Sequence, residues 1–205
     1  MVFVDDLAYE LFVLGFVAVL TLYMTLSVYF TFKRSKKADM YDVIDGAVLP
    51  LGLLGIYLFI MAVAGQLSWP LPGAFNMVYF DPMVSLAMVL IGFAYSIRAR
   101  LKMHYIGFFS LLVGIMTIYY GVIAYSLKLS LSPLGLFGLF FSFGAVAVLA
   151  FPVSLILDLK PGLTSEYPKV WVALLVLFWI ALLVAALVAF FTGFSAVPAH
   201  FSNPP

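Results

Sequence analysis

Apolar residues fill six long stretches of this chain, and a short polar or charged segment follows each stretch. Each stretch is about 20 residues long and apolar on all faces, as in a transmembrane helix and unlike the alternating strands of a membrane barrel. Only helices and closed barrels pair every backbone N–H and C=O group inside a bilayer. The sequence therefore predicts an all-α, polytopic transmembrane bundle that forms one domain over residues 1–205. The predicted spans are approximately residues 8–32, 43–65, 82–101, 105–127, 133–157 and 168–194.

Composition agrees with a lipid environment. Hydrophobic residues make up 66% of the 205 positions and charged residues 9%, whereas an ordinary soluble domain has about 45–50% and about 25%. A water-soluble fold could not bury this much apolar surface, so the lipid bilayer is the expected partner. The chain contains no cysteine, which excludes disulfides, thiolate metal sites and a cysteine nucleophile. Its net charge of +1 gives no reason to expect a nucleic-acid partner.

The Lys and Arg residues predict how the chain crosses the membrane. The segments after the first, third and fifth spans carry 4, 3 and 2 of them, and the opposite side carries only Lys128. The side rich in Lys and Arg is expected to face the cytoplasm. We therefore expect a multi-pass protein of the cell membrane with its N-terminus and C-terminus outside. The acidic N-terminus lacks the basic residues of a signal peptide, so the first span is expected to be retained.

The longest break in the apolar pattern without a Lys or Arg is residues 65–82, with the sequence GQLSWPLPGAFNMVYFDP. We expect an amphipathic connector that rests on the outer lipid surface, with Trp69 at the headgroup level. The alternative is a lid or re-entrant segment over an outward-facing pocket, since irregular backbone at membrane depth needs protein or a wet cavity beside it.

Polar residues of the same segment are the candidate ligand-binding groups. Asp81 and Pro82 have the order of a helix N-cap and first helical residue, which predicts that the third span begins there. Asn76 is expected to be a turn residue. In the alternative hypothesis, Asn76, Asp81 and Trp69 surround a binding pocket under the loop.

Asp39, Asp42 and Asp45 form a candidate acidic cluster on the cytoplasmic side. Their spacing of three places them on one helical face if the second span begins early. We expect them to pair with the basic residues at 33–37. A divalent-cation site is the alternative, because carboxylate oxygens suit hard cations.

The sequence offers little chemistry inside the membrane. No Asp, Glu, Lys, Arg or His lies in the middle third of a predicted span, so the midplane carboxylate of many ion-coupled carriers is missing. His104 and His200 fall on opposite sides and cannot share a haem or metal within one subunit. His104 is expected to join a basic cluster that meets anionic headgroups. No hydrolase motif is present. The sequence therefore predicts no catalytic residue, no metal and no cofactor.

Small residues form helical stripes in the fourth and fifth spans. Such stripes let helix backbones approach closely in a membrane, so we interpret them as packing seams rather than as a substrate path. The stripes are Ser110, Gly114, Thr117 and Gly121 in one span, and Gly135, Gly138, Ser142 and Ala145 in the next.

A short internal match suggests a 3+3 inverted repeat. The sequence PLGLLG at 50–55 resembles PLGLFG at 133–138, and these segments fall in the middle span of each half. Inverted repeats of this kind occur in many secondary transporters.

The loop also carries a resemblance to a known family. Trp69-Pro70-Leu71-Pro72-Gly73, then Asn76, then Asp81-Pro82 and a span ending in basic residues resemble a family of small archaeal integral membrane proteins catalogued only as a domain of unknown function. The similarity covers most of the chain. It implies a multi-span archaeal membrane protein with no established activity, substrate or cofactor, so no functional residue carries over.

Three functional hypotheses follow. The first is a non-enzymatic membrane component that packs against other membrane subunits or as a homo-oligomer. The second is a small permease or channel-like protein for a neutral or apolar solute. The third is an intramembrane enzyme or redox-chain subunit that handles a lipid or quinone. A polar cavity at the midplane would favour the transport hypothesis. A dry and filled interior would favour the non-enzymatic membrane component. Convergent polar groups around a lipid-shaped slot would favour the enzyme.

Overall fold

The computed structural model describes residues 6–34, 39–159 and 168–202, and these are almost entirely helical. Six helices in this part of the chain are long and apolar enough to cross a membrane, which confirms the predicted all-α, six-span bundle. A short helix, α2 (Met40–Ile44), and a 3-10 turn (Asp45–Ala47) precede the second of them. The long helices are α1 (Asp6–Arg34), α3 (Val48–Ser68), α4 (Ala74–Arg98), α5 (His104–Ser126), α6 (Pro133–Leu159) and α7 (Lys169–Ser202).

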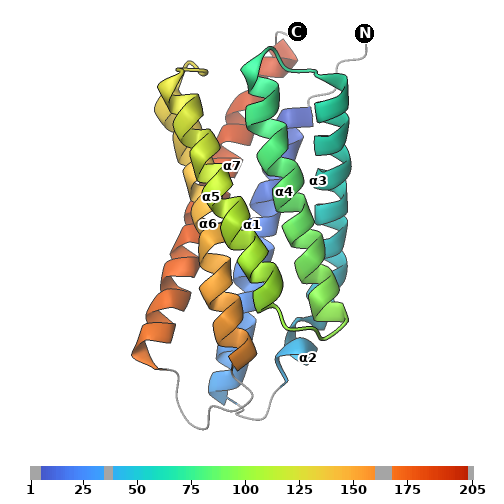
Figure 1. The fold of residues 1–205 in the computed structure, drawn as a ribbon, viewed down its shortest axis with the longest axis vertical. Coiled ribbons are helices and arrows are strands. Elements are labelled where there is room, and N and C mark those ends of the chain that lie inside the picture. Colours follow the sequence, from blue (N-terminus) through green and yellow to red (C-terminus); the bar gives the residue numbers. More distant parts are fainter. Residues whose placement is uncertain (1–5, 35–38, 160–167, 203–205) are drawn as a thin grey trace.

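The long helices form a ring. α1 packs on α7, α7 on α6, α6 on α5, α5 on α4 and α4 on α3, and α3 touches α1 again. α1 begins and α7 ends at the same end of the bundle (Figure 1), as an even number of spans requires. We call this the terminal end, and it also holds the connections 69–73 and 127–132.

The opposite end, which we call the basic end, contains most of the positive side chains of the described residues. Lys128 is the exception and lies at the terminal end. The basic end carries Lys33, Arg34, Arg98, Arg100, Lys102 and Lys169. The predicted separation of charge therefore exists between the two ends of the described bundle, while Lys36, Lys37 and Lys160 lie outside the described residues.

The connection between α3 and α4 is shorter than the sequence predicted. α3 continues to Ser68 and α4 begins at Ala74, so only residues 69–73 are non-helical. Asp81 and Pro82 lie inside α4, and the prediction that Asp81 caps this helix is wrong. The lack of an N–H on Pro82 is tolerated inside a transmembrane helix, where neighbouring groups can satisfy the freed carbonyl.

The last helix is longer than predicted. α7 passes through Pro198 to Ser202, beyond the predicted end of the sixth span at residue 194. Phe194 makes an edge-on contact with Phe12 of α1, with ring centroids 4.9 Å apart. This packing continues the α1–α7 interface up to the predicted end of the span.

The closest helix pair, α5 and α6, packs through small residues. A Cβ at Gly114 would lie 2.6 Å from the carbonyl oxygen of Gly144, so the two backbones nearly touch there. The stripe on α5 therefore acts as a packing seam, as predicted. On α6 the contact runs through Gly144 instead of Gly138, around which a Cβ would meet nothing within 4 Å. The face predicted for α6 was therefore wrong at Gly138.

The two halves of the bundle do not pack alike. A 3+3 inverted repeat would make the α1–α3 pair equivalent to the α5–α6 pair, but α5 and α6 form the most extensive contact and α1 and α3 one of the smaller ones. The matched glycines also differ in role. Gly55 lies tightly against Leu90 and Ile91, whereas the space around its counterpart Gly138 is open. The packing gives the short sequence match no structural counterpart.

Candidate functional site

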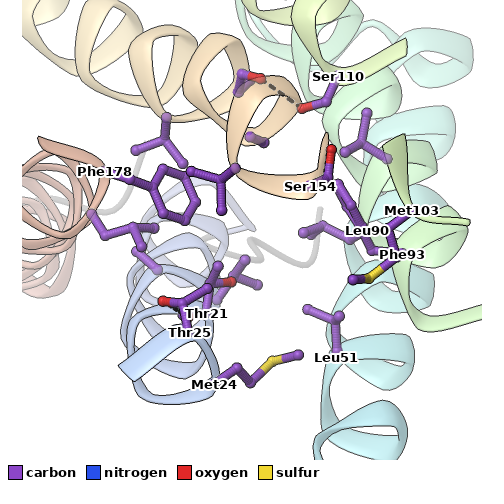
Figure 2. A pocket seen from close by; sticks show the side chains of 18 of the residues that line it. Thr21, Met24, Thr25, Leu51, Leu90, Phe93, Met103, Ser110, Ser154 and Phe178 are labelled. Atoms are coloured by element: carbon purple, nitrogen blue, oxygen red, sulfur yellow. Dashed lines mark hydrogen bonds between the residues drawn. The ribbon is translucent and has the colours of Figure 1, made fainter. Parts of the chain in front are cut away.

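An apolar cavity of about 140 Å³ lies at the centre of the ring. All six long helices contribute side chains to its wall. Figure 2 shows Met24, Leu51, Phe93 and Phe178 reaching toward the same space from four different helices. The cavity is thus a product of the ring, because its wall is made of side chains from all six long helices.

The residues of α1 and α6 that line the cavity follow one spacing. In both helices the lining positions are i, i+3, i+4, i+7, i+10, i+11 and i+14, which is a single continuous face of a helix. The series are Leu14, Val17, Ala18, Thr21, Met24, Thr25 and Val28 in α1, and Phe143, Val146, Ala147, Ala150, Val153, Ser154 and Leu157 in α6.

These two faces make the cavity long and narrow. Leu14 to Val28 covers about 21 Å along α1, since a helix rises about 1.5 Å per residue, and Phe143 to Leu157 covers about the same distance along α6. A volume of about 140 Å³ over this length is a slot. Its shape matches an extended hydrocarbon chain better than a round molecule.

The hydroxyl groups of Thr25, Ser110 and Ser154 in the wall donate to backbone carbonyls. Ser110 Oγ donates to the Ala147 carbonyl at 2.9 Å, and this bond joins α5 to α6. Ser154 Oγ donates to the Phe151 carbonyl of its own helix. Thr25 Oγ1 donates to the Thr21 carbonyl and accepts the indole N–H of Trp179 at 3.0 Å. The slot is therefore apolar in character despite its Ser and Thr residues.

A second, smaller cavity of about 40 Å³ lies toward the terminal end. Three residues, Leu14, Leu86 and Phe143, line both cavities and so stand between them. The remaining wall of the second cavity is Leu7, Leu11, Tyr79, Pro82, Met83, Thr117, Leu139 and Phe140.

Polar residues at the terminal end join three helices. Asp81 of α4 accepts hydrogen bonds from Gln66 Nε2 of α3 and from the Tyr120 hydroxyl of α5, each at 2.8 Å. This arrangement explains why Asp81 is inside a helix, since its carboxylate binds neighbouring helices. The sequence-based hypothesis missed Gln66 and Tyr120, whose contact with Asp81 depends on how the helices pack.

Asn76 and Trp69 shape the short turn beside this cluster. Asn76 is 1% exposed, and its amide group donates to the Gly65 carbonyl and accepts from the Leu71 N–H, each at 3.2 Å. Trp69 ends α3 in the left-handed region, with φ 51°. Asn76 thus fastens the turn to α3, while half of the Trp69 surface is exposed at the bundle's edge. The structure brings Asn76 and Asp81 to the same end but engages them with different partners.

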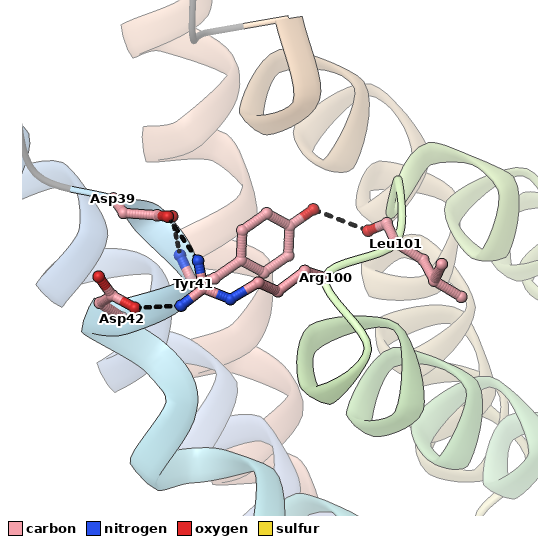
Figure 3. A network of polar contacts seen from close by, with 5 residues as sticks. All are labelled: Asp39, Tyr41, Asp42, Arg100 and Leu101. Atoms are coloured by element: carbon pink, nitrogen blue, oxygen red, sulfur yellow. Dashed lines mark hydrogen bonds and ion pairs between the residues drawn. The ribbon is translucent and has the colours of Figure 1, made fainter.

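Arg100 organises the acidic residues at the basic end. Its guanidinium contacts Asp39 Oδ2 at 2.8 Å and also Asp42 Oδ1 (Figure 3). The predicted pairing of these acids with the 33–37 cluster stays a prediction, since residues 35–37 lie outside the described part of the chain. The Asp42 carboxylate raises the pKa of Arg100 above its ordinary value, with Asp39 adding to the effect. Asp45 lies at the exposed end of α2, apart from these contacts.

The same network ties the start of the second span to the end of α4. The Tyr41 hydroxyl donates to the Leu101 carbonyl at 2.7 Å, next to Arg100 (Figure 3). Among the described residues, no group of three or more His, Cys, Asp or Glu side chains could hold a metal ion. The divalent-cation alternative for Asp39, Asp42 and Asp45 therefore has no structural support.

His104 does not join the basic cluster as expected. Its ring Nδ1 lies 2.7 Å from Asp158 Oδ2 of α6, and its backbone N–H donates to the same oxygen. The adjacent residues Met103 and Leu157 line the central cavity. The His104–Asp158 pair therefore lies next to the cavity's wall at the basic end.

A buried acid also escaped the sequence analysis. Glu10 of α1 is fully buried, between positions that line the second cavity on the same helix. The only sequence signal was its place inside the first span, because a carboxylate there is costly without protein around it. The cavity-lining series had a signal as well: the spacing of the seven lining positions in α1 recurs in α6, but both spans are so apolar that this face does not stand out.

Comparison with known proteins places the chain in a family. The family described as "Protein of unknown function (DUF981)" matches residues 1–203, so this chain belongs to it. The resemblance to a domain of unknown function is thereby confirmed. No curated protein and no solved structure matches the chain.

Proposed function

We propose that this member of the family is a non-enzymatic membrane component that binds a hydrocarbon chain in its central cavity. The observation that carries the proposal is the long apolar slot between α1 and α6, bounded by all six long helices. The bound hydrocarbon chain could belong to a membrane lipid or to a free apolar molecule. Both present the same chemistry to the wall.

Energetics support an occupant. An empty cavity of 140 Å³ costs about 3 kcal/mol, if about 24 cal/mol is lost per Å³ as in soluble protein cores. Water is a poor filler, because apolar cavities stay dry and hydroxyls such as those of Ser110 and Ser154 are already bonded to backbone carbonyls. A hydrocarbon chain restores the missing van der Waals contacts without leaving a polar group unpaired.

The other hypotheses receive less support. A permease for a polar solute would need a wet, polar path, and the slot is lined almost entirely by apolar atoms. An enzyme would need polar groups that converge on the slot, whereas the Asp81 cluster lies at the terminal end with its own partners. Transport of an apolar solute stays a prediction, since a binding slot is one of its requirements.

Assembly with other subunits or as a homo-oligomer also stays a prediction. The α5 stripe that motivated it faces α6 within the same chain, at Gly114 and Gly121. The exposed surface of the helices is apolar and suits the lipid bilayer. The positive-inside rule supports a cell-membrane protein with the terminal end outside and the basic end in the cytoplasm. The archaeal origin implied by the resemblance is likewise a prediction.

Photolabelling tests the proposed binding. The full-length protein in lipid nanodiscs would be irradiated with a straight-chain alkane that carries a diazirine, and labelled residues mapped by mass spectrometry. We expect labelling of slot residues such as Met24 and Met103 in addition to lipid-facing residues such as Ile115. A second arm uses a phospholipid with the diazirine in its acyl chain, which distinguishes a lipid chain from a free hydrocarbon.

Matched variants separate the slot from the lipid surface. Ala18→Phe and Ala150→Phe place a ring in the slot and should abolish labelling of Met24 and Met103. Ala173→Phe adds the same ring at an exposed position of α7 and should leave it unchanged. If the slot residues stay unlabelled by both probes in the unaltered protein, the proposal is wrong.

A further inference from the structure

We propose that Leu14, Leu86 and Phe143 form a partition that sets the length of the hydrocarbon chain the central cavity accepts. This inference rests on the proposed function and names the residues that determine its specificity. The three residues are the ones that line both the central cavity and the second cavity.

The partition is built from three helices that do not follow one another in the chain. Leu14 comes from α1, Leu86 from α4 and Phe143 from α6. Leu14 and Phe143 are each 9% exposed and belong to one core cluster, against which Leu86 packs. Their positions lie about 12–18 Å from the helix ends at the terminal end, by the helical rise of about 1.5 Å per residue. The three residues therefore lie at depths that differ by about 6 Å along their helices.

Space continues on the far side of the partition. The second cavity is lined by apolar side chains, among them Leu11, Met83 and Leu139. It extends to Tyr79 and Pro82, which flank Asp81 in the sequence. A chain that passed the partition would thus remain in apolar surroundings until it approached the polar cluster of Asp81 at the terminal end.

The partition predicts a limit on chain length. A hydrocarbon that fits the central slot contacts the partition with its end, whereas a longer one must displace Phe143 or Leu86. Packed cores resist such displacement, because the side chains sit in rotamer minima with few voids. The protein should therefore prefer short chains, and removing the partition should let longer chains occupy both cavities.

Two variants open the partition, and each has a matched control. Phe143→Ala and Leu86→Ala remove a shared wall residue. Phe141→Ala and Leu112→Ala remove the same residue types from exposed positions, which are 49% and 51% exposed. Phe143→Leu is a milder opening for use if the alanine variants do not fold.

The experiment compares short and long straight-chain alkanes, each with a diazirine at its end, on the protein in nanodiscs. Filling the additional 40 Å³ should raise the ratio of long to short probe bound about fivefold in Phe143→Ala. The long probe should then label Leu11 or Met83 in the second cavity. The control variants should keep the ratio of the unaltered protein.

The outcomes distinguish the two proposals. Absence of slot labelling by either probe in the unaltered protein contradicts the proposed function itself. Slot labelling with the same long-to-short ratio in the unaltered protein, Phe143→Ala and Leu86→Ala leaves the binding site standing and overturns the partition. Labelling of Leu11 or Met83 by the long probe in the unaltered protein also overturns it.

Discussion

Asp158 and His104 meet through a single oxygen: Asp158 Oδ2 lies 2.7 Å from both the ring Nδ1 and the backbone nitrogen of His104. His104 is the first residue of α5, and Asp158 lies in the last turn of α6. The carboxylate thus occupies the position of an N-cap, although it comes from another helix. It satisfies a free N–H at the start of α5 and fixes the ring at the same time.

Asp158→Ala should lower the stability of the bundle by about 0.5–2 kcal/mol, the range for loss of a helix cap. The side chain is only 5% exposed, so water cannot easily replace it. Unfolding by sodium dodecyl sulfate in mixed micelles measures the change. Asp45→Ala at the exposed end of α2 is the control and should change stability little. Equal effects of the two substitutions would contradict the capping role.

Tyr120→Phe should destabilise the bundle by about 0.6 kcal/mol, the average for interhelical hydrogen bonds in a membrane, and by at most about 1.7 kcal/mol. The substitution deletes the hydroxyl that donates to Asp81 and leaves the ring in place. Tyr119→Phe removes the same hydroxyl from a residue that is 62% exposed and should be neutral. The unfolding assay described above compares the two. A neutral Tyr120→Phe would show that the bond between α4 and α5 adds no stability.

Gly114→Ala should cost about 1–3 kcal/mol, because the added methyl group would lie 2.6 Å from the Gly144 carbonyl and force the α5–α6 seam apart. Gly138→Ala is the matched control, since no atom lies within 4 Å of the added carbon. It should be stabilising by about 0.5–1 kcal/mol through better helix propensity. Thermal unfolding in detergent would reveal these opposite signs, and a tolerated Gly114→Ala would argue against the close approach.

Lys128→Gly should stabilise the protein by about 1 kcal/mol, because Lys128 has a φ of 50° at the end of α5 and a left-handed conformation is costly for a residue with a Cβ. Lys102→Gly offers a control at a connection where the residue does not have a positive φ. It should be neutral or slightly destabilising, as glycine increases the freedom of the unfolded chain. The melting temperatures of the two variants test the difference.

The orientation can be tested with single cysteines, since the natural chain has none. Leu131→Cys lies in the connection at the terminal end, and Lys102→Cys lies at the basic end. A membrane-impermeant thiol reagent should label Leu131→Cys in intact cells, and Lys102→Cys only after permeabilisation. The reverse pattern would place the terminal end in the cytoplasm and contradict the positive-inside assignment.

The candidate site could be predicted only in part. Asp81 and Asn76 stood out as polar residues in an apolar sequence. Their partners Gln66 and Gly65 belong to the last turns of α3, which the sequence analysis assigned to the connecting loop instead. Arg100 pairs with Asp39 and Asp42 from about sixty positions away in the sequence, and a local charge pattern could not identify that partner. The residues that line the central cavity are regularly spaced in α1 and α6. Nearly every position in those spans is apolar, however, so the sequence does not distinguish the cavity-lining face from the other faces.

The sequence by itself determined the lipid environment and the number of spans, because these depend on the length and hydrophobicity of each segment. It also determined the separation of positive charge, because this depends on which connecting segments carry Lys and Arg. A run of about 20 apolar residues must pair its backbone internally in lipid, whatever its neighbours are. Tertiary structure decided which helices pack, where Asp81 and Asp158 find their hydrogen bonds, and that the ring leaves a slot at its centre. Lipid is as apolar as the core, so hydrophobicity cannot tell an inward-facing side chain from an outward-facing one. The close approach of two helix backbones at Gly114 and Gly144, and the lack of such packing around the slot, make that distinction.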